Sequence, residues 1–234
     1  MYDLSLSSSL RKPKAKVTPN RPIAGAFKKK AATPTQFRKF YVRGDLPCCI
    51  QHRGGATLNR IQWKINLVDI DYSIYLPILF DGLREKKQPY KTLAVQGIQD
   101  FLSANKTNVL ENGSEVDKVL PVIPLLVIPL KRALTTKDRK VIPVALQAIQ
   151  MLLREDATGM VGEALVPYYR QLLPTMNLFK NFSHNTGDAP DFNQKNDMAQ
   201  VITDTLEMME QHGGEDAFIN IKYMIPTYES CMQD

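Results

Sequence analysis

The sequence is poor in the residues that build metal centres and disulfide frameworks. Its 234 residues include three cysteines and three histidines. His52, His184 and His212 lie far apart, and no cysteine or histidine pair has the spacing of a zinc site. Cys48 and Cys49 are adjacent, which suits reduced thiols better than a disulfide framework. We therefore expect neither a metal site nor a disulfide.

Signatures of catalysis and of nucleic-acid recognition are also missing. The Gly54-Gly55 and Gly213-Gly214 pairs lack the lysine and the Ser/Thr that a phosphate-binding loop requires. Cys48 could act as a nucleophile only if a distant histidine reached it through the fold, and nothing in the sequence indicates this. Zinc fingers, helix-turn-helix patterns and the aromatic motifs of RNA-recognition domains are absent. We expect a protein that is not an enzyme, binds no cofactor and has no nucleic-acid partner.

No uninterrupted apolar segment is long enough to cross a bilayer, which takes about 20 residues. The longest run, from 119 to 130, is shorter and ends at Lys131 and Arg132. The first ten residues, MYDLSLSSSL, lack the basic start and the continuous apolar core of a secretory signal. These absences predict a protein that stays inside the cell and has no membrane partner.

Positive charge is concentrated near the N-terminus. The formal net charge is +6, but residues 1–43 carry eleven lysines and arginines against one acidic residue, Asp3. Residues 44–234 carry 19 basic and 23 acidic residues. The first segment is also rich in serine and proline, which predicts an intrinsically disordered basic arm over 1–43 that becomes ordered on an acidic partner. Charge alone leaves nucleic acid, an anionic membrane and an acidic polymer such as tubulin as candidate partners.

The most apolar part of the chain, residues 119–153, predicts two helices joined by a polar corner at 131–140. Apolar side chains cover most of both helices, so each helix needs neighbours on several sides. Pro121 suits a helix start, whereas Pro129 should bend the first helix. A helix pair that is apolar on several faces belongs in the middle of a stack. The sequence therefore predicts a mainly α fold, an armadillo/HEAT-like stack of helix pairs.

The remaining elements are placed by periodicity and by turn residues. Strand-like residues on both sides of a glycine-containing turn predict a small β-hairpin at 47–67, before the helices. Helix pairs are expected at about 71–104, 117–154 and 160–212, followed by a C-terminal segment at 215–234. Polar stretches at 103–117 and 181–197 predict an insertion and a loop. Together these elements predict one helical domain over 44–234.

Four stretches are more specific than these patterns. They are AGAFKKKAATPTQFRKFYVRGDLP from residue 24, LPILFDGL from residue 76, ALVPYYRQLLP from residue 164 and GGEDAFINIKYMIPTYESC from residue 213. In content and order they resemble the Parkin co-regulated gene protein family, from about residue 24 to the C-terminus. The first 23 residues and the stretch 103–117 depart from the family pattern.

The resemblance implies a non-enzymatic structural protein of cilia and flagella. Members of this family are microtubule inner proteins at the inner junction of the axonemal doublet, where the B-tubule closes onto the A-tubule. Their fold is an armadillo/HEAT-like α-helical stack, which agrees with the periodicity above. The implied partners are α/β-tubulin, a small β-sandwich inner-junction protein and other microtubule inner proteins. The implied location is the axoneme of a cilium or flagellum, within the cytoskeleton.

Two sets of contact residues follow from the basic arm and from the C-terminal motif. Tubulin is acidic, so we expect the arm to bind it through positive charge and aromatic anchors. The predicted tubulin-binding residues are Arg21, Phe27, Lys28, Lys29, Lys30, Phe37, Arg38, Lys39, Phe40, Tyr41 and Arg43. The predicted residues for the inner-junction partner are Lys222, Tyr223, Pro226, Tyr228 and Glu229.

Two alternatives stay open. The C-terminal motif could dock back on the last helix pair of its own domain instead of facing a partner. The whole protein could also be a soluble helical-repeat adaptor for protein cargo or chaperone complexes, with the same fold and the arm as a localisation signal.

Overall fold

The computed structural model describes residues 29, 33–51, 60–110, 117–180 and 198–232. Most of the predicted arm and the predicted loop at 181–197 lie outside these residues. The described chain is mainly helical, with a two-stranded antiparallel hairpin before the paired helices. The predicted fold class is therefore confirmed.

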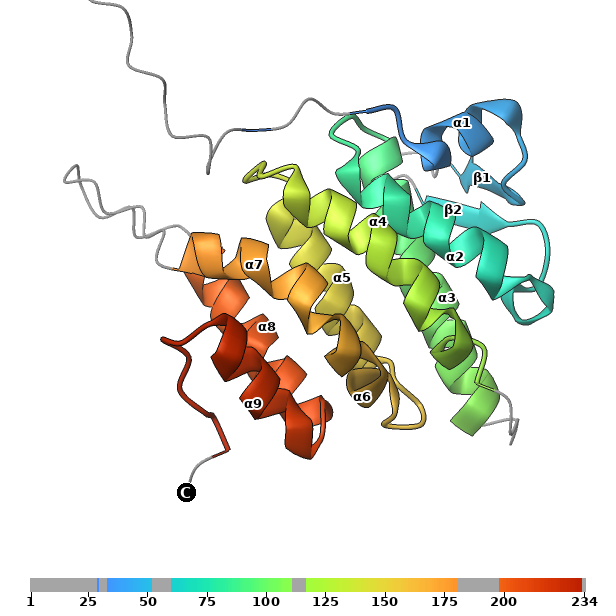
Figure 1. Cartoon of the computed structure of the whole chain (residues 1–234). Helices are drawn as coiled ribbons and strands as arrows, with labels where there is room; N and C mark the ends of the chain where they lie inside the picture. The colour runs from blue at the N-terminus through green and yellow to red at the C-terminus, as the bar shows by residue number, and fades with distance from the viewer. Residues whose placement is uncertain (1–28, 30–32, 52–59, 111–116, 181–197, 233–234) are drawn as a thin grey trace, which may run out of the picture.

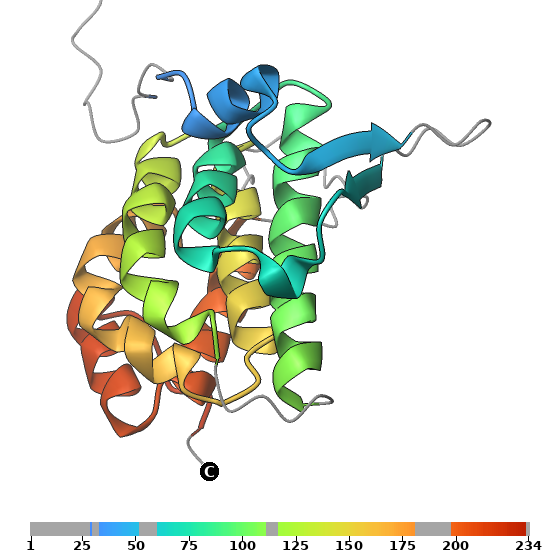
Figure 2. The same cartoon turned by 90° about the vertical axis from the view of Figure 1, so that its right-hand side faces the viewer.

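The paired helices form two layers (Figures 1 and 2). The first layer contains α2 (Tyr72–Asp81), α4 (Ile123–Thr135), α7 (Tyr169–Lys180) and α9 (Glu215–Met224). The second layer contains α3 (Tyr90–Leu110), α5 (Ile142–Arg154) and α8 (Met198–His212). Successive helices within each layer contact one another, and α2, α4 and α7 each contact the long helix that follows them in the chain. This two-layer arrangement of successive pairs is an armadillo/HEAT-like stack.

Short elements connect these helices. They are the 3-10 turns Leu67–Asp69, Gly82–Arg84, Leu120–Val122 and Val166–Tyr168, and the one-turn helix α6 (Val161–Leu165).

The α4–α5 pair lies in the middle of the stack, as the sequence predicts. α4 packs between α2 and α7, and α5 packs between α3 and α8. Leu126 and Leu130 of α4 and Leu146 and Ile149 of α5 are fully buried. Each such side chain contributes about 1.5–3 kcal/mol through burial. Coverage on several sides explains why this stretch is apolar nearly all round.

α3 is longer than the sequence predicts. It continues to Leu110, inside the stretch that was predicted to be an insertion from residue 103. The Asn105 amide donates to Asp117 Oδ1 at 2.9 Å, and its carbonyl oxygen accepts the Lys118 N–H at 3.0 Å. The residues from 103 to 110 are mostly polar, but they include neither glycine nor proline, and polarity alone does not end a helix.

α1 (Gln36–Arg43) corrects the predicted boundary of the arm. Thr35 caps its N-terminus by accepting the Arg38 N–H at 3.2 Å, and Gly44 ends it with a φ of 81°. Phe37 is 1% exposed and packs into the core beside α2. The folded domain therefore includes the chain from residue 33, because one buried aromatic face outweighs the basic composition of this short helix.

The predicted hairpin is confirmed. β1 (Cys48–Gln51) pairs with β2 (Arg60–Trp63) in antiparallel register, with Cys48 opposite Trp63. The Trp63 indole donates to Asp100 Oδ2 at 2.8 Å, and its ring meets the edge of Phe101 with the ring centres 5.3 Å apart. The hairpin and α1 thus cover the α2–α3 end of the stack, while α9 lies at the opposite end (Figure 1).

The joint between α8 and α9 is unusually close to α6. A Cβ added to Gly162 of α6 would lie 2.0 Å from the backbone carbonyl oxygen of His212. No residue with a side chain fits there without moving the backbone, so glycine sets the distance between α6 and the end of α8.

Candidate functional site

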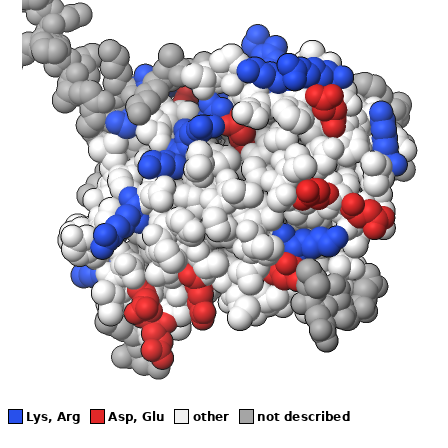
Figure 3. Space-filling model, turned by 45° about the vertical axis from the view of Figure 1, so that its right-hand side comes forward, with Lys and Arg blue, Asp and Glu red and all other residues white. Residues whose placement is uncertain are grey.

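Charge is divided between two edges of the helical stack. The turns inside the first two helix pairs, at 84–91 and 131–140, are rich in lysine and arginine, whereas the connections at 154–156 and 214–216 carry more acidic than basic residues. Figure 3 shows lysines and arginines gathered over the upper and upper-left part of one face, with most acidic side chains lower down. The folded part is therefore electrostatically two-sided, although its sequence is mildly acidic as a whole.

We call the positive side the basic edge. It is formed by exposed or half-exposed residues of α1, of the α2–α3 turn and of the α4–α5 corner. Its members are Arg38, Lys39, Arg43, Lys86, Lys87, Lys131, Arg132, Lys137, Arg139 and Lys140.

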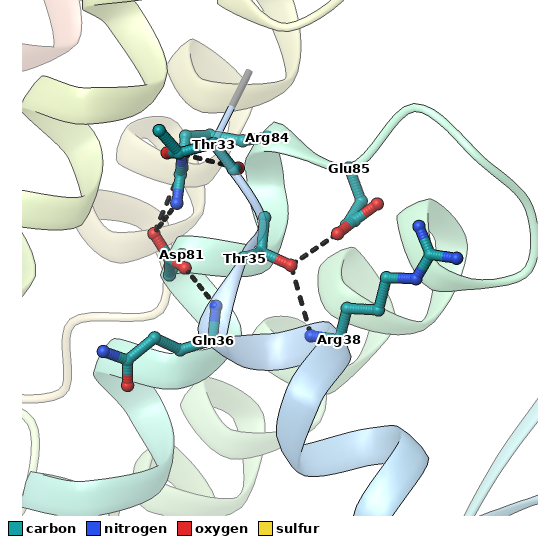
Figure 4. Close-up of polar contacts among 7 residues, drawn as sticks. All are labelled: Thr33, Thr35, Gln36, Arg38, Asp81, Arg84 and Glu85. Carbon is teal, nitrogen blue, oxygen red and sulfur yellow. Dashed lines mark hydrogen bonds and ion pairs between the residues drawn. The ribbon is translucent and has the colours of Figure 1, made fainter.

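A buried ion pair attaches α1 to this edge (Figure 4). Arg84 donates to Asp81 Oδ1 through Nε at 3.1 Å and Nη2 at 2.5 Å, and both side chains are less than a tenth exposed. Asp81 Oδ2 accepts the backbone N–H of Gln36 at 2.7 Å, and Arg84 Nη1 donates to Thr33 Oγ1 at 2.8 Å. We call these four residues the α1 clamp. Their contacts fix the chain immediately before α1 and the first residue of the helix against the end of α2.

A second contact strengthens the same junction. The Thr35 hydroxyl donates to Glu85 Oε1, while its oxygen accepts the N–H of Arg38. The Arg38 side chain points away from the clamp in Figure 4, and its guanidinium carbon lies 5.0 Å from the centre of the Tyr90 ring. α1 therefore presents its basic side chains from a fixed backbone.

Asp138 connects the α2–α3 turn to the α4–α5 corner. This buried carboxylate lies 2.5 Å from Lys86 Nζ and 3.8 Å from Lys29 Nζ, and it accepts the backbone N–H of Lys140 at 3.0 Å. Burial by itself would raise the pKa of Asp138, but the hydrogen bonds from Lys86 and Lys140 and the nearby lysine charges bring the pKa below its ordinary value. Asp138 thus places Lys29, from the predicted arm, on the basic edge.

A groove of about 750 Å³ opens between α1 and the α2–α3 turn. Most of its polar lining is cationic. Among its lining residues are Arg38, Lys39, Val42, Arg43, Lys86 and Lys87. Val42 is 69% exposed, so an aliphatic side chain stands among the positive charges.

The aromatic residues that were predicted to anchor the arm on tubulin have other neighbours. Phe37 is buried, and Phe40 and Tyr41 are half-buried against the core of the domain. The Tyr41 ring meets the edge of the Tyr90 ring with the centres 5.5 Å apart. These three side chains pack against the core of their own domain because the apolar face of α1 is turned toward it. They are therefore not surface anchors in this structure.

The predicted basic contact residues that the structure describes lie on the surface. Arg38, Lys39 and Arg43 are exposed on the basic edge, and Lys29 is 63% exposed beside Asp138. Four predicted contacts lie outside the described residues: Arg21, Phe27, Lys28 and Lys30.

The C-terminal motif docks back on its own domain around Glu210 of α8. Glu210 is 6% exposed and accepts the Tyr228 hydroxyl at 2.6 Å, the Ser230 hydroxyl and the Cys231 N–H at 3.0 Å. Burial would raise the pKa of Glu210, but these hydrogen bonds outweigh it and lower the pKa. Burial, followed by the contact with Glu210, raises the pKa of Tyr228. Lys222 Nζ also donates to the Tyr228 carbonyl at 2.7 Å.

This docking separates the predicted partner-binding residues into two groups. Tyr228 is 2% exposed and belongs to the interior of the domain. Lys222, Tyr223, Pro226 and Glu229 are exposed, and the exposed fraction of Tyr223 is 75%. The Arg170 guanidinium carbon lies 5.9 Å from the centre of the Tyr223 ring.

The sequence analysis missed the contribution of the folded domain to the positive surface. Lys86, Lys87, Lys137 and Lys140 lie far from the N-terminus, in a part of the chain that is acidic on average. The available signal was the charge of the individual turns: those inside the first two pairs, at 84–91 and 131–140, are basic, and the connections at 154–156 and 214–216 are acidic. In a two-layer stack, alternate turns lie on the same edge.

The described parts of the chain hold no set of three His, Cys, Asp or Glu side chains arranged to bind a metal ion. No helix among the placed residues combines the length and the apolarity that crossing a bilayer requires. Burial, and next the neighbouring Cys49, raise the pKa of the Cys48 thiol to about 11, the opposite of an activated nucleophile.

Comparison with known proteins agrees with the sequence motifs. A family model described as Parkin co-regulated protein matches residues 35–230. The chain is 49% identical over 213 residues to a mouse (Mus musculus) protein named Parkin coregulated gene protein homolog, covering 90% of this chain and 83% of the mouse protein. The region matched by the family model begins at Thr35, the N-cap of α1, and ends within the segment docked on Glu210, so it spans the folded domain. The chain belongs to the Parkin co-regulated protein family.

Proposed function

We propose that this protein is a non-enzymatic microtubule inner protein of the axonemal doublet, which helps to bridge the A- and B-tubules at the inner junction. Family membership suggests the role, and the basic edge is the observation that carries it. Tubulin is an acidic polymer, and a row of fixed cations attracts it without requiring each cation to face one particular carboxylate.

The arm and the basic edge act on the same partner in this proposal. Residues 1–32 carry eight basic residues and one acidic residue, and Lys29 lies beside the Lys86–Asp138 ion pair on the edge. Arg21, Phe27, Lys28 and Lys30 would extend the contact that Arg38, Lys39 and Arg43 begin. The stacked helices would serve as a spacer between tubulin and the neighbouring protein.

In this proposal the opposite end of the stack meets a second partner. Tyr223, Pro226, Lys222 and Glu229 form an exposed group on and after α9. We assign this group to the small β-sandwich inner-junction protein, with other microtubule inner proteins nearby. Tyrosine suits such a contact because it offers a large ring with a polar tip.

Co-sedimentation with microtubules tests the tubulin contact. Lys131→Glu/Arg132→Glu reverses two charges of the basic edge near the C-terminal end of α4. Its control, Lys64→Glu/Arg154→Glu, makes the same change of net charge with two exposed residues outside that edge. We expect the edge variant to lose about 10-fold in affinity, since four units of charge change on an exposed surface amount to roughly 1.4 kcal/mol.

The control should bind within about 3-fold of the wild type, a difference of under 1 kcal/mol. Equal losses in both variants would show that only net charge matters and would remove the basic edge from the proposal. Extraction of axonemes with detergent and moderate salt separates this function from the adaptor alternative, since an adaptor would wash out while a doublet component would be retained.

A further inference from the structure

We propose that the groove between α1 and the α2–α3 turn binds an extended peptide segment that is rich in Glu and Asp and carries an aliphatic side chain. This inference deepens the proposed function, on which it rests for the use of the basic edge. It assigns the groove to a flexible acidic segment of a partner rather than to a folded surface.

The charge of the lining selects the ligand. Arg38, Lys39 and Arg43 enter from α1, and Lys86 and Lys87 enter from the α2–α3 turn. The lining includes one carboxylate, Glu85, and that group accepts the Thr35 hydroxyl. A peptide with several carboxylates would find arginine and lysine donors on two facing walls, and charge-assisted hydrogen bonds are stronger than neutral ones.

Most of the surface that lines the same groove is apolar. Val42 is among its lining residues and is 69% exposed, and Pro34 lines the wall nearby. The carbon stems of the neighbouring arginines and lysines add apolar surface while their heads stay in water. An aliphatic ligand side chain between two carboxylates would therefore cover Val42 and leave the charges paired.

The walls of the groove are held in place before any ligand arrives. The α1 clamp fixes the start of α1 to the end of α2, and the Arg38 guanidinium lies against Tyr90. A volume of about 750 Å³ is within the range of pockets that hold small ligands or short peptide segments. A preformed site loses less conformational entropy when a ligand binds.

Two other occupants fit less well. The chain's own residues 1–32 are strongly basic, so the lining would repel them. A single-stranded nucleic acid would need aromatic faces for its bases, and the lining residues include no aromatic side chain.

Fluorescence anisotropy with the full chain tests the proposal. The probe is a short labelled peptide of glutamates with one central isoleucine, and two matched peptides replace the glutamates by glutamine or the isoleucine by serine. Lys39→Glu/Arg43→Glu places two reversed charges in the groove. The control, Lys131→Glu/Arg132→Glu, makes the same charge change on the same edge but outside the groove.

We expect the groove variant to bind the glutamate peptide at least about 10-fold more weakly than the wild type, and the control variant to lose less than about 3-fold. Val42→Ser should weaken binding of the isoleucine peptide by about 3-fold and leave the serine peptide unchanged, as expected for removing a small apolar contact. Val42 is exposed, so this variant does not depend on refolding the core.

Three outcomes would overturn the inference: no binding of the glutamate peptide by the wild type, equal losses in the groove and control variants, or stronger competition by a single-stranded oligonucleotide than by the unlabelled peptide. Microtubule co-sedimentation of the same variants keeps the two proposals apart. Sedimentation without peptide binding removes the groove assignment alone, and peptide binding without sedimentation removes the tubulin role alone.

Discussion

The two ends of the helical stack are each closed by a segment held on a buried carboxylate, but the two carboxylates have different partners. At the α1 end, Asp81 is paired with the buried cation Arg84. At the α9 end, Glu210 accepts its closest hydrogen bonds from neutral groups of Tyr228, Ser230 and Cys231. The α1 end is therefore held by a buried ion pair, and the α9 end by hydrogen bonds from neutral donors to one carboxylate.

The largest expected effect is at the α1 end. Asp81→Ala would leave the Arg84 guanidinium buried without its carboxylate, which costs about 3–5 kcal/mol of unfolding free energy. Chemical denaturation followed by Trp63 fluorescence measures it, because Trp63 lies at this end of the stack. The double variant Asp81→Leu/Arg84→Met, which removes both charges, should recover much of the loss. A cost below about 1 kcal/mol for Asp81→Ala would mean that the clamp does not hold α1.

A smaller effect is expected at the α9 end. Tyr228→Phe removes a hydroxyl that donates to the charged Glu210, and such hydrogen bonds contribute about 1.5–3 kcal/mol. Hydrogen exchange of residues 225–232 should become faster while the exchange of α2 and α3 stays unchanged. The matched control is Tyr223→Phe, which should change stability by less than about 0.5 kcal/mol because Tyr223 is exposed. Similar effects of the two substitutions would contradict the docking on Glu210.

The smallest effect is the acid sensitivity of the α9 end. The pKa of Glu210 is lowered in the folded state, so its contribution to stability is fully present above the unfolded pKa of about 4.3 and is lost as the pH falls through the lower folded value. We expect hydrogen exchange at 225–232 to become faster as the pH falls through that acid range. Exchange that stays unchanged across this range would contradict the contribution of the Glu210 carboxylate.

The sequence was sufficient for the features that depend on periodicity. The apolar stripes of 119–153 predicted the central pair, and alternating strand-like residues predicted the hairpin that the structure contains. α1 was missed because its basic residues dominate the composition, although Phe37, Phe40 and Tyr41 recur at helical spacing between a Thr35 cap and Gly44. A search for short capped helices inside the basic arm would have found it.

The features that the sequence could not supply depend on contacts between distant residues. Glu210 and Tyr228 are separated by 18 positions, and nothing local indicates that the carboxylate accepts this hydroxyl. Asp138 and Lys86 are joined across two helix pairs in the same way. Local patterns report which side chains are apolar or charged, but they do not report which partner satisfies a buried polar group.

Gly162 has a mechanical consequence for a protein proposed to separate two surfaces. Where helices meet through side chains, rotamer changes can alter their separation by small amounts, but here the His212 carbonyl rests directly against the glycine. Main chain touching main chain leaves no soft layer to compress. The end of α8 is therefore held at a fixed distance from α6, and a load applied there reaches α6 without first compressing a layer of side chains.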